Sequence, residues 1–247
     1  IVHRGPDDSG ACVAAGTAIS MRRLSIIDVA QGHQPITSED GFHSIVFNGE
    51  IYNYRDLRPV LEAKGHRFRT ASDTEVILHL FARSRERTMH GALREALLQL
   101  EGAFSLVFLA EDRILVARDP NGFRPLAFGQ MELSGGRVCY VFASETCAFD
   151  LIGAVYIGEV EPGEIVTVGP DGITRERYAP KRPQSHCVFE HVYFSRPDSH
   201  VFGRSVNEVR TNLGRVLARE QPADADVVVP LPDSGVCAAV GFADEAG

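Results

Sequence analysis

Three short stretches carry polar residues that a purely structural segment would not need. "MRRLSIID" places Arg22 and Arg23 at the end of a predicted strand, "FNGEIYNY" ends a strand with Asn48 and Gly49, and "SDTE" places Asp73 where a helix begins. A guanidinium is the best side-chain partner for a carboxylate. An acid can pair with an ammonium group, and an asparagine amide beside a backbone N–H can stabilise an oxyanion.

Each stretch also has a structural interpretation, and alone each favours it. Arg23 could be a surface arginine lying along a strand. Asn48-Gly49 is a common hairpin turn. Asp73 would stabilise the first turn of a helix by itself, although a cap would also fix the position of a functional acid.

The first hundred residues are predicted to alternate strands and helices around these stretches. The residues Ser72 and Glu75 have the spacing of a capping box, which predicts that a helix begins at Ser72. The predicted elements are strands at 11–20 and 43–47, a helix at 54–64 that Asn53 caps and Gly65 ends, a helix from Ser72 through 82, and a helix at 91–100.

The remainder is predicted to be rich in strands and to end in an α/β pattern. A capping box at Ser205 and Glu208 predicts the start of a long helix, and the valine run after it predicts the first strand of a parallel sheet. The predicted elements are strands at 104–110 and 113–119 joined by a turn at 111–113, a strand at 137–143, a short helix from Ser144, a hairpin around Asp171-Gly172, a linker at 179–186, a helix at 205–220 and a strand within 225–235.

Taken in order, six motifs resemble the class II glutamine amidotransferases, which are N-terminal-nucleophile hydrolases. The motifs are HRGPDDSG, RRLSIID, FNGEIYNY, GHRFRTASDTE, ARDPNGFRPL and FASE. In that family the side-chain amide of glutamine is hydrolysed to release ammonia. Each motif alone is weak, but the ordered set is specific.

The resemblance divides between two families. Residues 3–80 resemble glutamine-hydrolysing asparagine synthetase, on "RLSIIDVAQGHQPI" and "VFNGEIYNYRDLRPVLEAKGHRFRT". Residues 76–247 resemble amidophosphoribosyltransferase, on "YVFASETCAFDLIGA", "CVFEHVYFSRPDS" and "ADVVVPLPDSG". The second resemblance covers more of the chain and implies that ammonia passes to phosphoribosyl pyrophosphate, giving phosphoribosylamine for purine biosynthesis. The alternatives are the glutaminase domain of asparagine synthetase and a non-catalytic fragment or glutamine-binding module.

The resemblance implies a role for each candidate residue. Arg23 matches the family's carboxylate-binding arginine, and Asp73 matches the acid that pairs with the ammonium group. Asn48 and Gly49 match the oxyanion hole, with Glu50 beside them in substrate binding. A supporting role falls to Arg4 in the first motif.

The family's nucleophile is a cysteine at the mature N-terminus, whose α-amino group acts as the base. Residue 1 is isoleucine here, so the resemblance implies that the catalytic cysteine and an opening strand and helix are missing from this chain. We expect none of the five cysteines to replace it. The nearest is Cys12, which is predicted to lie within a strand. The parent protein is therefore expected to be an enzyme, and the chain by itself to be inactive.

The implied fold is α+β: a four-layer αββα sandwich of the Ntn-hydrolase glutaminase type, truncated at its N-terminus, followed by the start of an α/β phosphoribosyltransferase domain. The corresponding domains are residues 1–186 and residues 187–247. The two resemblances meet near "SDTEVILHL". We expect the fold to continue without a break across this junction, because both families use one sandwich.

Composition narrows the cofactors, partners and compartment. The net charge of -8 argues against a nucleic-acid partner, and no apolar run approaches a membrane span. Five scattered cysteines without CxxC spacing indicate a reducing, cytoplasmic compartment. Nine scattered histidines without HxxxH or HExxH spacing indicate no ordinary metal site. No cofactor is expected in this chain. The resemblance implies Mg²⁺, and in some relatives a 4Fe–4S cluster with Cys187 as one ligand, in the full-length parent. The implied partners are glutamine, phosphoribosyl pyrophosphate and further copies of the chain in a homo-oligomer.

Overall fold

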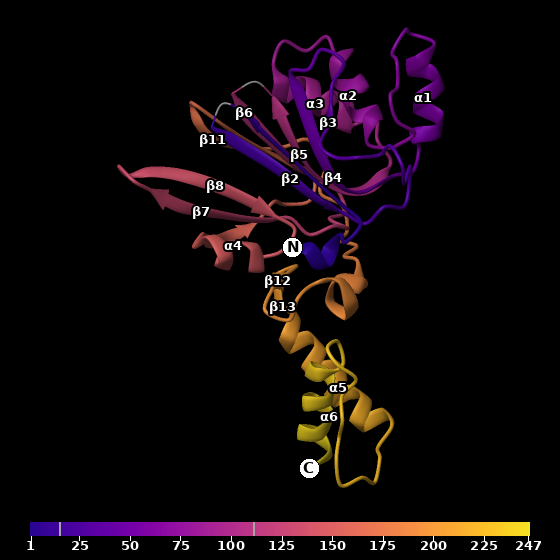
Figure 1. Cartoon of the computed structure of the whole chain (residues 1–247), viewed down its shortest axis with the longest axis vertical. Coiled ribbons are helices and arrows are strands. Elements are labelled where there is room, and N and C mark those ends of the chain that lie inside the picture. The colour runs from indigo at the N-terminus through magenta and orange to yellow at the C-terminus, as the bar shows by residue number, and fades with distance from the viewer. Residues whose placement is uncertain (15, 111) are drawn as a thin grey trace. The chain divides into compact units, whose positions relative to one another are not determined.

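A computed structural model describes residues 1–14, 16–110 and 112–247. These residues form two compact units. Unit 1 consists of residues 1–126 and 160–186, and unit 2 consists of residues 127–159 and 187–247. Figure 1 gives the elements along the chain, and each unit is described by itself.

Unit 1 is built on a six-stranded antiparallel sheet with the order β11-β10-β6-β5-β4-β3. Strands 104–110 and 113–119 were predicted as a pair, and β5 and β6 confirm that pairing, although Glu111 in the predicted turn lies outside the described residues. The strands are β3 (Ile36–Thr37), β4 (His43–Ile51), β5 (Gly102–Ala110), β6 (Arg113–Arg118), β10 (Glu164–Gly169) and β11 (Gly172–Arg177).

The helices of unit 1 cover one face of this sheet. Their bounds are α1 (Tyr54–Glu62), α2 (Glu75–Ala82) and α3 (Met89–Leu97). Almost every side chain of α2 is buried, because the helix carries the apolar run "VILHLFA". A single core contains Ile45, Phe81, Phe108, Leu115 and Ile165, and so joins the segments on both sides of "SDTEVILHL". The prediction that the fold continues without a break across this junction is therefore confirmed for unit 1.

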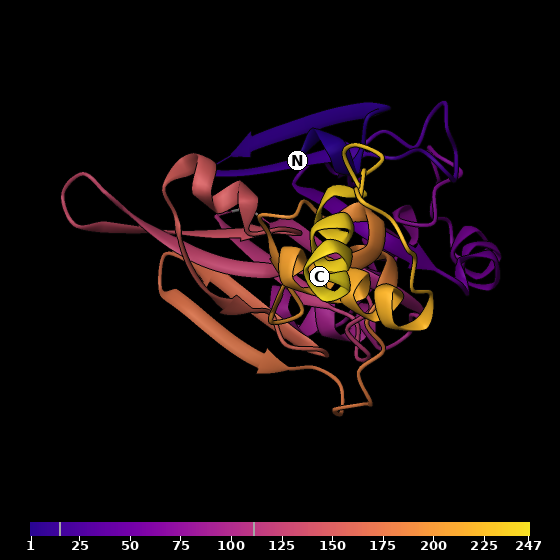
Figure 2. The same ribbon diagram turned by 90° about the horizontal axis from the view of Figure 1, so that it is seen from below.

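A two-stranded hairpin, β1 (Asp8–Ala14) and β2 (Thr17–Arg23), corrects the prediction of one strand over 11–20. Gly16 has a φ of +76°, which favours glycine and lets the chain reverse, and Ala15 lies outside the described residues. β2 packs against β4. Figure 2 shows this indigo hairpin and the orange strand β11 on opposite sides of unit 1. A short 3-10 helix, η1 (Val2–Arg4), precedes the hairpin.

The capping box predicted at Ser72 is wrong, because α2 begins at Glu75. The carboxylate of Glu75 does not reach back to Ser72. It accepts hydrogen bonds from the main chain of Arg69 and Thr70 instead. The capping box at Ser205 is confirmed in its first half, since the Ser205 hydroxyl accepts from the Glu208 N–H at 3.3 Å.

Unit 2 holds a three-stranded sheet with the order β8-β7-β9, a small β-hairpin and the C-terminal helices. Two glycines let α5 and α6 approach closely, because a Cβ on Gly214 or Gly241 would lie 1.9 Å from a carbonyl oxygen of the other helix. The elements are β7 (Ala127–Leu133), β8 (Arg137–Ala143), α4 (Cys147–Ile152), β9 (Val155–Glu159), η2 (Glu190–Phe194), β12 (His200–Val201), β13 (Arg204–Ser205), α5 (Val206–Glu220) and α6 (Val236–Ala246).

The strand predicted within 225–235 is absent from the described residues, which corrects that prediction. Val227 and Val229 are 71% and 80% exposed, and no described strand pairs with them. A β-branched run needs a neighbouring strand for its backbone hydrogen bonds, so composition alone does not make it a strand. In the part of the chain that the structure describes, we find no helix long and apolar enough to cross a membrane.

Candidate active site

The backbone of Gly49 is directed away from the neighbouring strand β5. Gly49 lies opposite Phe104 in the ladder. Phe104 uses both of its backbone groups on Asp119: its N–H donates to the carboxylate at 3.2 Å, and its carbonyl accepts from the Asp119 N–H at 2.9 Å. Since Phe104 faces Asp119, the pair with Gly49 is of the non-hydrogen-bonded kind, and the N–H of Gly49 points to the outer side of β4.

Alternate residues of a strand direct their N–H groups to the same side, so this outer side also carries the N–H groups of Phe47 and Ile51. The Phe47 N–H donates to Gln34 Oε1 at 2.7 Å. The Ile51 N–H donates to Asp73 Oδ2 at 2.8 Å. The Gly49 N–H thus lies on the strand side that carries Asp73, which places the candidate oxyanion donor and the candidate ammonium partner on one side of β4.

Position 49 requires glycine for two reasons. Its φ of +151° lies in the region that favours glycine. A Cβ there would also lie 2.0 Å from the Ala103 carbonyl oxygen. The side chains of Asn48 and Glu50 point to the sheet face opposite the helix-side core, because Phe47 and Ile51 belong to that core and strand side chains alternate.

Asp73 is buried just before α2. Burial raises the pKa of its carboxyl, and the nearby charge of Glu50 raises it further, while the hydrogen bonds from Ile51 and Thr74 oppose the rise. The charges of Glu50 and Asp73 therefore interact, although the two residues are far apart in sequence. An added positive charge beside this carboxylate would be favourable.

Arg23 ends β2 and is buried. Its Nη2 donates to the carbonyl oxygens of Ile27 and Asp28, at 2.5 Å and 3.1 Å. The carboxylate of Asp28 in turn accepts from the Ala71 N–H at 2.6 Å. A path of hydrogen bonds therefore runs from Arg23 through Asp28 to the segment that carries Asp73.

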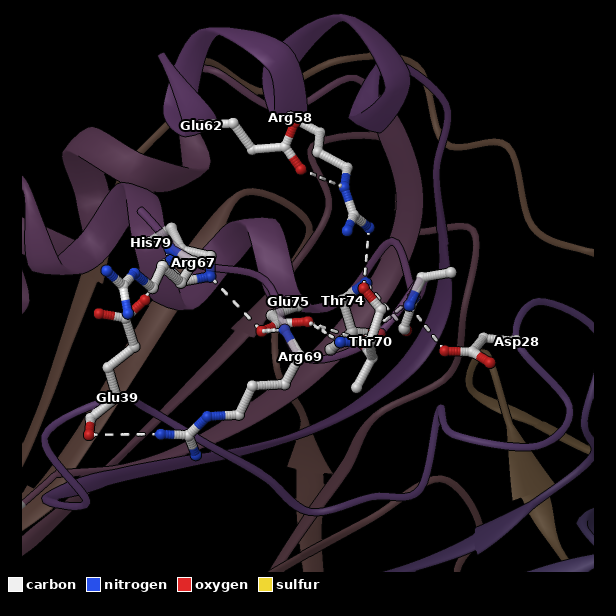
Figure 3. A network of polar contacts seen from close by, with 12 residues as sticks. Asp28, Glu39, Arg58, Glu62, Arg67, Arg69, Thr70, Thr74, Glu75 and His79 are labelled. Atoms are coloured by element: carbon white, nitrogen blue, oxygen red, sulfur yellow. Dashed lines mark hydrogen bonds and ion pairs between the residues drawn. The ribbon is translucent and has the colours of Figure 1, made fainter. Parts of the chain in front are cut away.

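The segment 69–71 belongs to no helix or strand, and side chains satisfy its backbone groups (Figure 3). Glu75 accepts from the N–H groups of Arg69 and Thr70, each at 2.8 Å. Arg58 Nη1 donates to the Thr70 carbonyl at 2.8 Å. In Figure 3, Asp28 and Glu75 approach the segment from opposite sides. The main chain before Asp73 is thereby fixed.

Arg4 lies half-buried at the end of η1, beside the end of β2. The next residue, Gly5, packs on that strand: its carbonyl accepts from Arg22 Nε at 3.0 Å, and a Cβ on it would lie 2.3 Å from Arg22. The structure thus brings Arg4 to the element that ends in Arg23. It leaves the supporting role of Arg4 a prediction.

Sequence reasoning missed Asp28, Gln34, Glu75 and Asp119 as residues that build the site. Three of them act on partners distant in sequence: Asp28 on Ala71, Gln34 on Phe47 and Asp119 on Phe104. The signal for Glu75 was its spacing from Ser72, and it was interpreted as a capping box. Its carboxyl is buried, which raises its pKa, but the His79 ring, whose Nε2 lies 3.5 Å away, and the hydrogen bonds from Arg69 and Thr70 outweigh burial and lower the pKa to about 2.

Two of the five cysteines, Cys12 and Cys187, bear on the candidate chemistry. Cys12 lies within β1, paired with Ile19, as predicted. Among the residues described, no group of three or more His, Cys, Asp or Glu side chains could hold a metal ion. A 4Fe–4S cluster needs four ligands, so Cys187 by itself does not fit one.

The chain matches one protein family over more than half of its length. A family model described as a glutamine amidotransferase domain matches residues 1–156, more than half of the chain. The chain therefore belongs to the glutamine amidotransferase domain family, and the recognition made from the motifs is confirmed.

The relatives indicate a particular branch of that family. Amidophosphoribosyltransferase 1, chloroplastic, from Arabidopsis thaliana is 49% identical over 216 residues, which are 87% of this chain and 38% of that protein. Amidophosphoribosyltransferase from Bacillus subtilis (strain 168) is 42% identical over 211 residues, which are 85% of this chain and 43% of that protein. The chain spans about two fifths of the length of these relatives.

Two solved structures show a similarity to the same kind of protein. Glutamine phosphoribosylpyrophosphate amidotransferase from B. subtilis, complexed with ADP and GMP, matches 98% of this chain and 58% of its own with a TM-score of 0.86 at 36% identity. A structure described as the allosteric regulatory enzyme of purine biosynthesis matches 92% of this chain and 49% of its own with a TM-score of 0.85 at 40% identity. The α+β fold of the glutaminase type is thereby confirmed. Because the relatives match 85–87% of the chain, they include much of residues 3–80 and do not favour the asparagine synthetase alternative.

Proposed function

We propose that Arg23, Asn48, Gly49, Glu50 and Asp73 bind L-glutamine for hydrolysis of its side-chain amide. The observation that carries the proposal is the pairing of Asp73 with the Ile51 N–H, on the side of β4 that the Gly49 N–H also faces. Glutamine presents an ammonium group and an amide, and both must be held at once for the reaction.

Each residue takes one part of the substrate. The Asp73 carboxylate pairs with the ammonium group, with Glu50 beside it. The hydrogen bonds of Arg23 to its own loop use Nη2, so a single N–H of Nη1 or Nε is proposed as the donor for the α-carboxylate. The Gly49 N–H and the Asn48 amide stabilise the oxyanion of the tetrahedral intermediate, each donor contributing about 3 kcal/mol. Arg4 supports the Arg23 end of the site.

The five residues of the proposed site bind the substrate and stabilise charge, and none of them is proposed to attack the amide carbon. Amide hydrolysis through a covalent intermediate also needs a nucleophile and a base. Ammonia release by the purified chain would make Cys12 the first residue to test as a nucleophile.

We further propose the activity of the whole protein from its relatives. Ammonia released at this site would displace pyrophosphate from phosphoribosyl pyrophosphate at a second site, giving phosphoribosylamine for purine biosynthesis. Residues 1–186 would be the glutamine amidotransferase domain, and residues 187–247 would begin the phosphoribosyltransferase domain. Mg²⁺ would belong to the phosphoribosyl half. We also propose that the whole protein forms a homo-oligomer and is located in the cytoplasm.

Calorimetric titration with L-glutamine tests the binding site. We expect the wild-type chain to bind L-glutamine, and the Arg23→Met and Asp73→Asn variants to bind at least tenfold more weakly. Arg94→Gln serves as the control, because Arg94 is exposed on α3. Wild-type affinity retained in both site variants would contradict the assignment. A wild-type chain that binds no glutamine would favour the alternative that the chain is a non-catalytic fragment.

A further inference from the structure

We propose that Asp28 is a positioning residue that couples the Arg23 loop to the main chain carrying Asp73. The inference deepens the proposed glutamine site and rests on it. Because the ammonium and carboxylate groups of an amino acid share one carbon atom, the two charged side chains that hold them need a fixed spacing. Asp28 is the residue whose contacts can set that spacing.

Asp28 contacts both parts of the site at once. Its carbonyl oxygen accepts from Arg23 Nη2 at 3.1 Å and from the Gly32 N–H at 2.8 Å. Its carboxylate accepts from the Ala71 N–H at 2.6 Å and from the Gln31 N–H at 3.1 Å. One residue therefore holds the guanidinium with its main chain and the neighbourhood of Asp73 with its side chain.

The loop around Arg23 is shaped to hold Asp28 in this role. Asp28 has a φ of +52°, in the left-handed region that aspartate and asparagine tolerate better than most residues. A Cβ on Gly32 would lie 2.5 Å from Arg23 Nη2 and 2.8 Å from the Asp28 carbonyl. The chain thus closes tightly around the guanidinium and fixes the direction of the Asp28 backbone.

The partner segment is prepared to receive this contact. The N–H groups of Arg69 and Thr70 are taken by Glu75, while that of Ala71 is taken by Asp28. Two residues further on, Asp73 binds the Ile51 N–H at the end of β4. A displacement of the Arg23 loop would therefore be transmitted through Ala71 to Asp73.

Three substitutions separate the hydrogen bond from charge and from backbone strain. Asp28→Ala removes the carboxylate, and Asp28→Gly removes it while keeping the left-handed φ without cost. Asp28→Asn keeps one acceptor oxygen for the Ala71 N–H, gives up the acceptor for the Gln31 N–H, and tolerates the same φ. Asp40→Asn is the matched control, because Asp40 accepts from the Phe42 N–H at 3.0 Å within its own turn.

The experiment measures L-glutamine affinity by calorimetry and exchange of the Ala71 amide hydrogen by NMR, on the full chain. We expect the Ala and Gly variants to bind glutamine about tenfold more weakly and to exchange the Ala71 amide at least tenfold faster. The Asp40 control should stay within twofold of wild type, and the Asn variant should be clearly less impaired than the Ala variant. In wild type, Arg23→Lys should also speed exchange at Ala71, and in the Asp28→Ala background it should add no further effect.

Two results would overturn the proposal. One is unchanged Ala71 exchange in Asp28→Ala and Asp28→Gly. The other is an Asn variant as impaired as the Ala variant, which would assign the effect to charge and not to the hydrogen bond. If wild type binds no glutamine, the proposed function fails, and the exchange data alone decide whether Asp28 couples the two segments.

Discussion

At the scale of single residues, the candidate site depends on where backbone groups point. Asp119 takes both backbone groups of Phe104, and so the Gly49 N–H points to the outer side of β4. Asp73 then holds the next N–H on that side, from Ile51. The proposed donor for the oxyanion and the proposed partner for the ammonium group thus lie along the same side of β4.

The first prediction concerns the pH dependence of glutamine binding. Burial and the charge of Glu50 raise the pKa of Asp73. Binding an ammonium group needs the carboxylate, so protons compete with glutamine as the pH falls through this raised pKa. We expect affinity to fall by up to tenfold per pH unit on the acid side, beginning above the usual range of aspartate. Asp73→Asn should bind weakly and show no such fall in titrations between about pH 4 and 7.

The second prediction concerns Gly49. Gly49→Ala should lower the free energy of unfolding by about 3 kcal/mol, because the added Cβ meets the Ala103 carbonyl at 2.0 Å. Gly41→Ala is the control: Gly41 has a φ of +81° but open space around it. Its cost should be about 1 kcal/mol, from the backbone conformation alone. Equal costs in urea denaturation would show that the close approach is not what requires glycine at position 49.

At the scale of elements, the segment 69–73 is held by side chains and not by a regular element. Local sequence therefore predicts regular elements elsewhere in the chain better than it predicts this segment. The pairing of β5 with β6 and the cap at Ser205 were predicted correctly because the residues involved are close in sequence. The hairpin turn at Gly16 was missed because small apolar residues continue across it.

The third prediction concerns Glu75. Glu75→Gln leaves at least one N–H of Arg69 or Thr70 without its acceptor and should cost about 1–3 kcal/mol of stability near neutral pH. The folded-state pKa is lowered from 4.5 to about 2. The stabilisation from Glu75 is therefore present above the unfolded pKa and lost as the pH falls through the folded pKa. The difference between wild type and variant, measured by urea denaturation, should close between about pH 5 and pH 2.

Glu62→Gln is the control for that measurement. Glu62 forms an ion pair with Arg58 at 2.9 Å on the exposed surface of α1, and such a pair contributes at most about 0.5 kcal/mol. A loss in Glu75→Gln no larger than in Glu62→Gln would contradict the role given to Glu75.

At the scale of the whole molecule, one core in unit 1 joins residues from both sides of "SDTEVILHL". The sequence motifs differ on the two sides, but the packing is continuous. The valine run at 227–229 is a case in which composition misleads. Its composition predicts a strand, but the described residues offer no strand to pair with it. Long-range contacts such as Asp28 to Ala71 could not be predicted, because the folded chain alone brings these residues together.

The fourth prediction tests this single core. Phe108 is fully buried, and its ring centroid lies 4.5 Å from that of Phe81 on α2. Phe108→Ala should cost about 3–5 kcal/mol, and hydrogen exchange of α2 and of the sheet should accelerate together. Phe42→Ala, at a side chain that is 71% exposed, should change stability by less than about 0.5 kcal/mol. Loss of protection in α2 with the sheet unaffected would indicate two separate cores.

The most direct test of the central claim is a crystal structure of this chain with L-glutamine bound. We expect the α-carboxylate on Arg23, the ammonium group on Asp73, and the side-chain amide oxygen within hydrogen-bonding distance of the Gly49 N–H. Glutamine bound away from β4, or bound there with neither Arg23 nor Asp73 in contact, would contradict it.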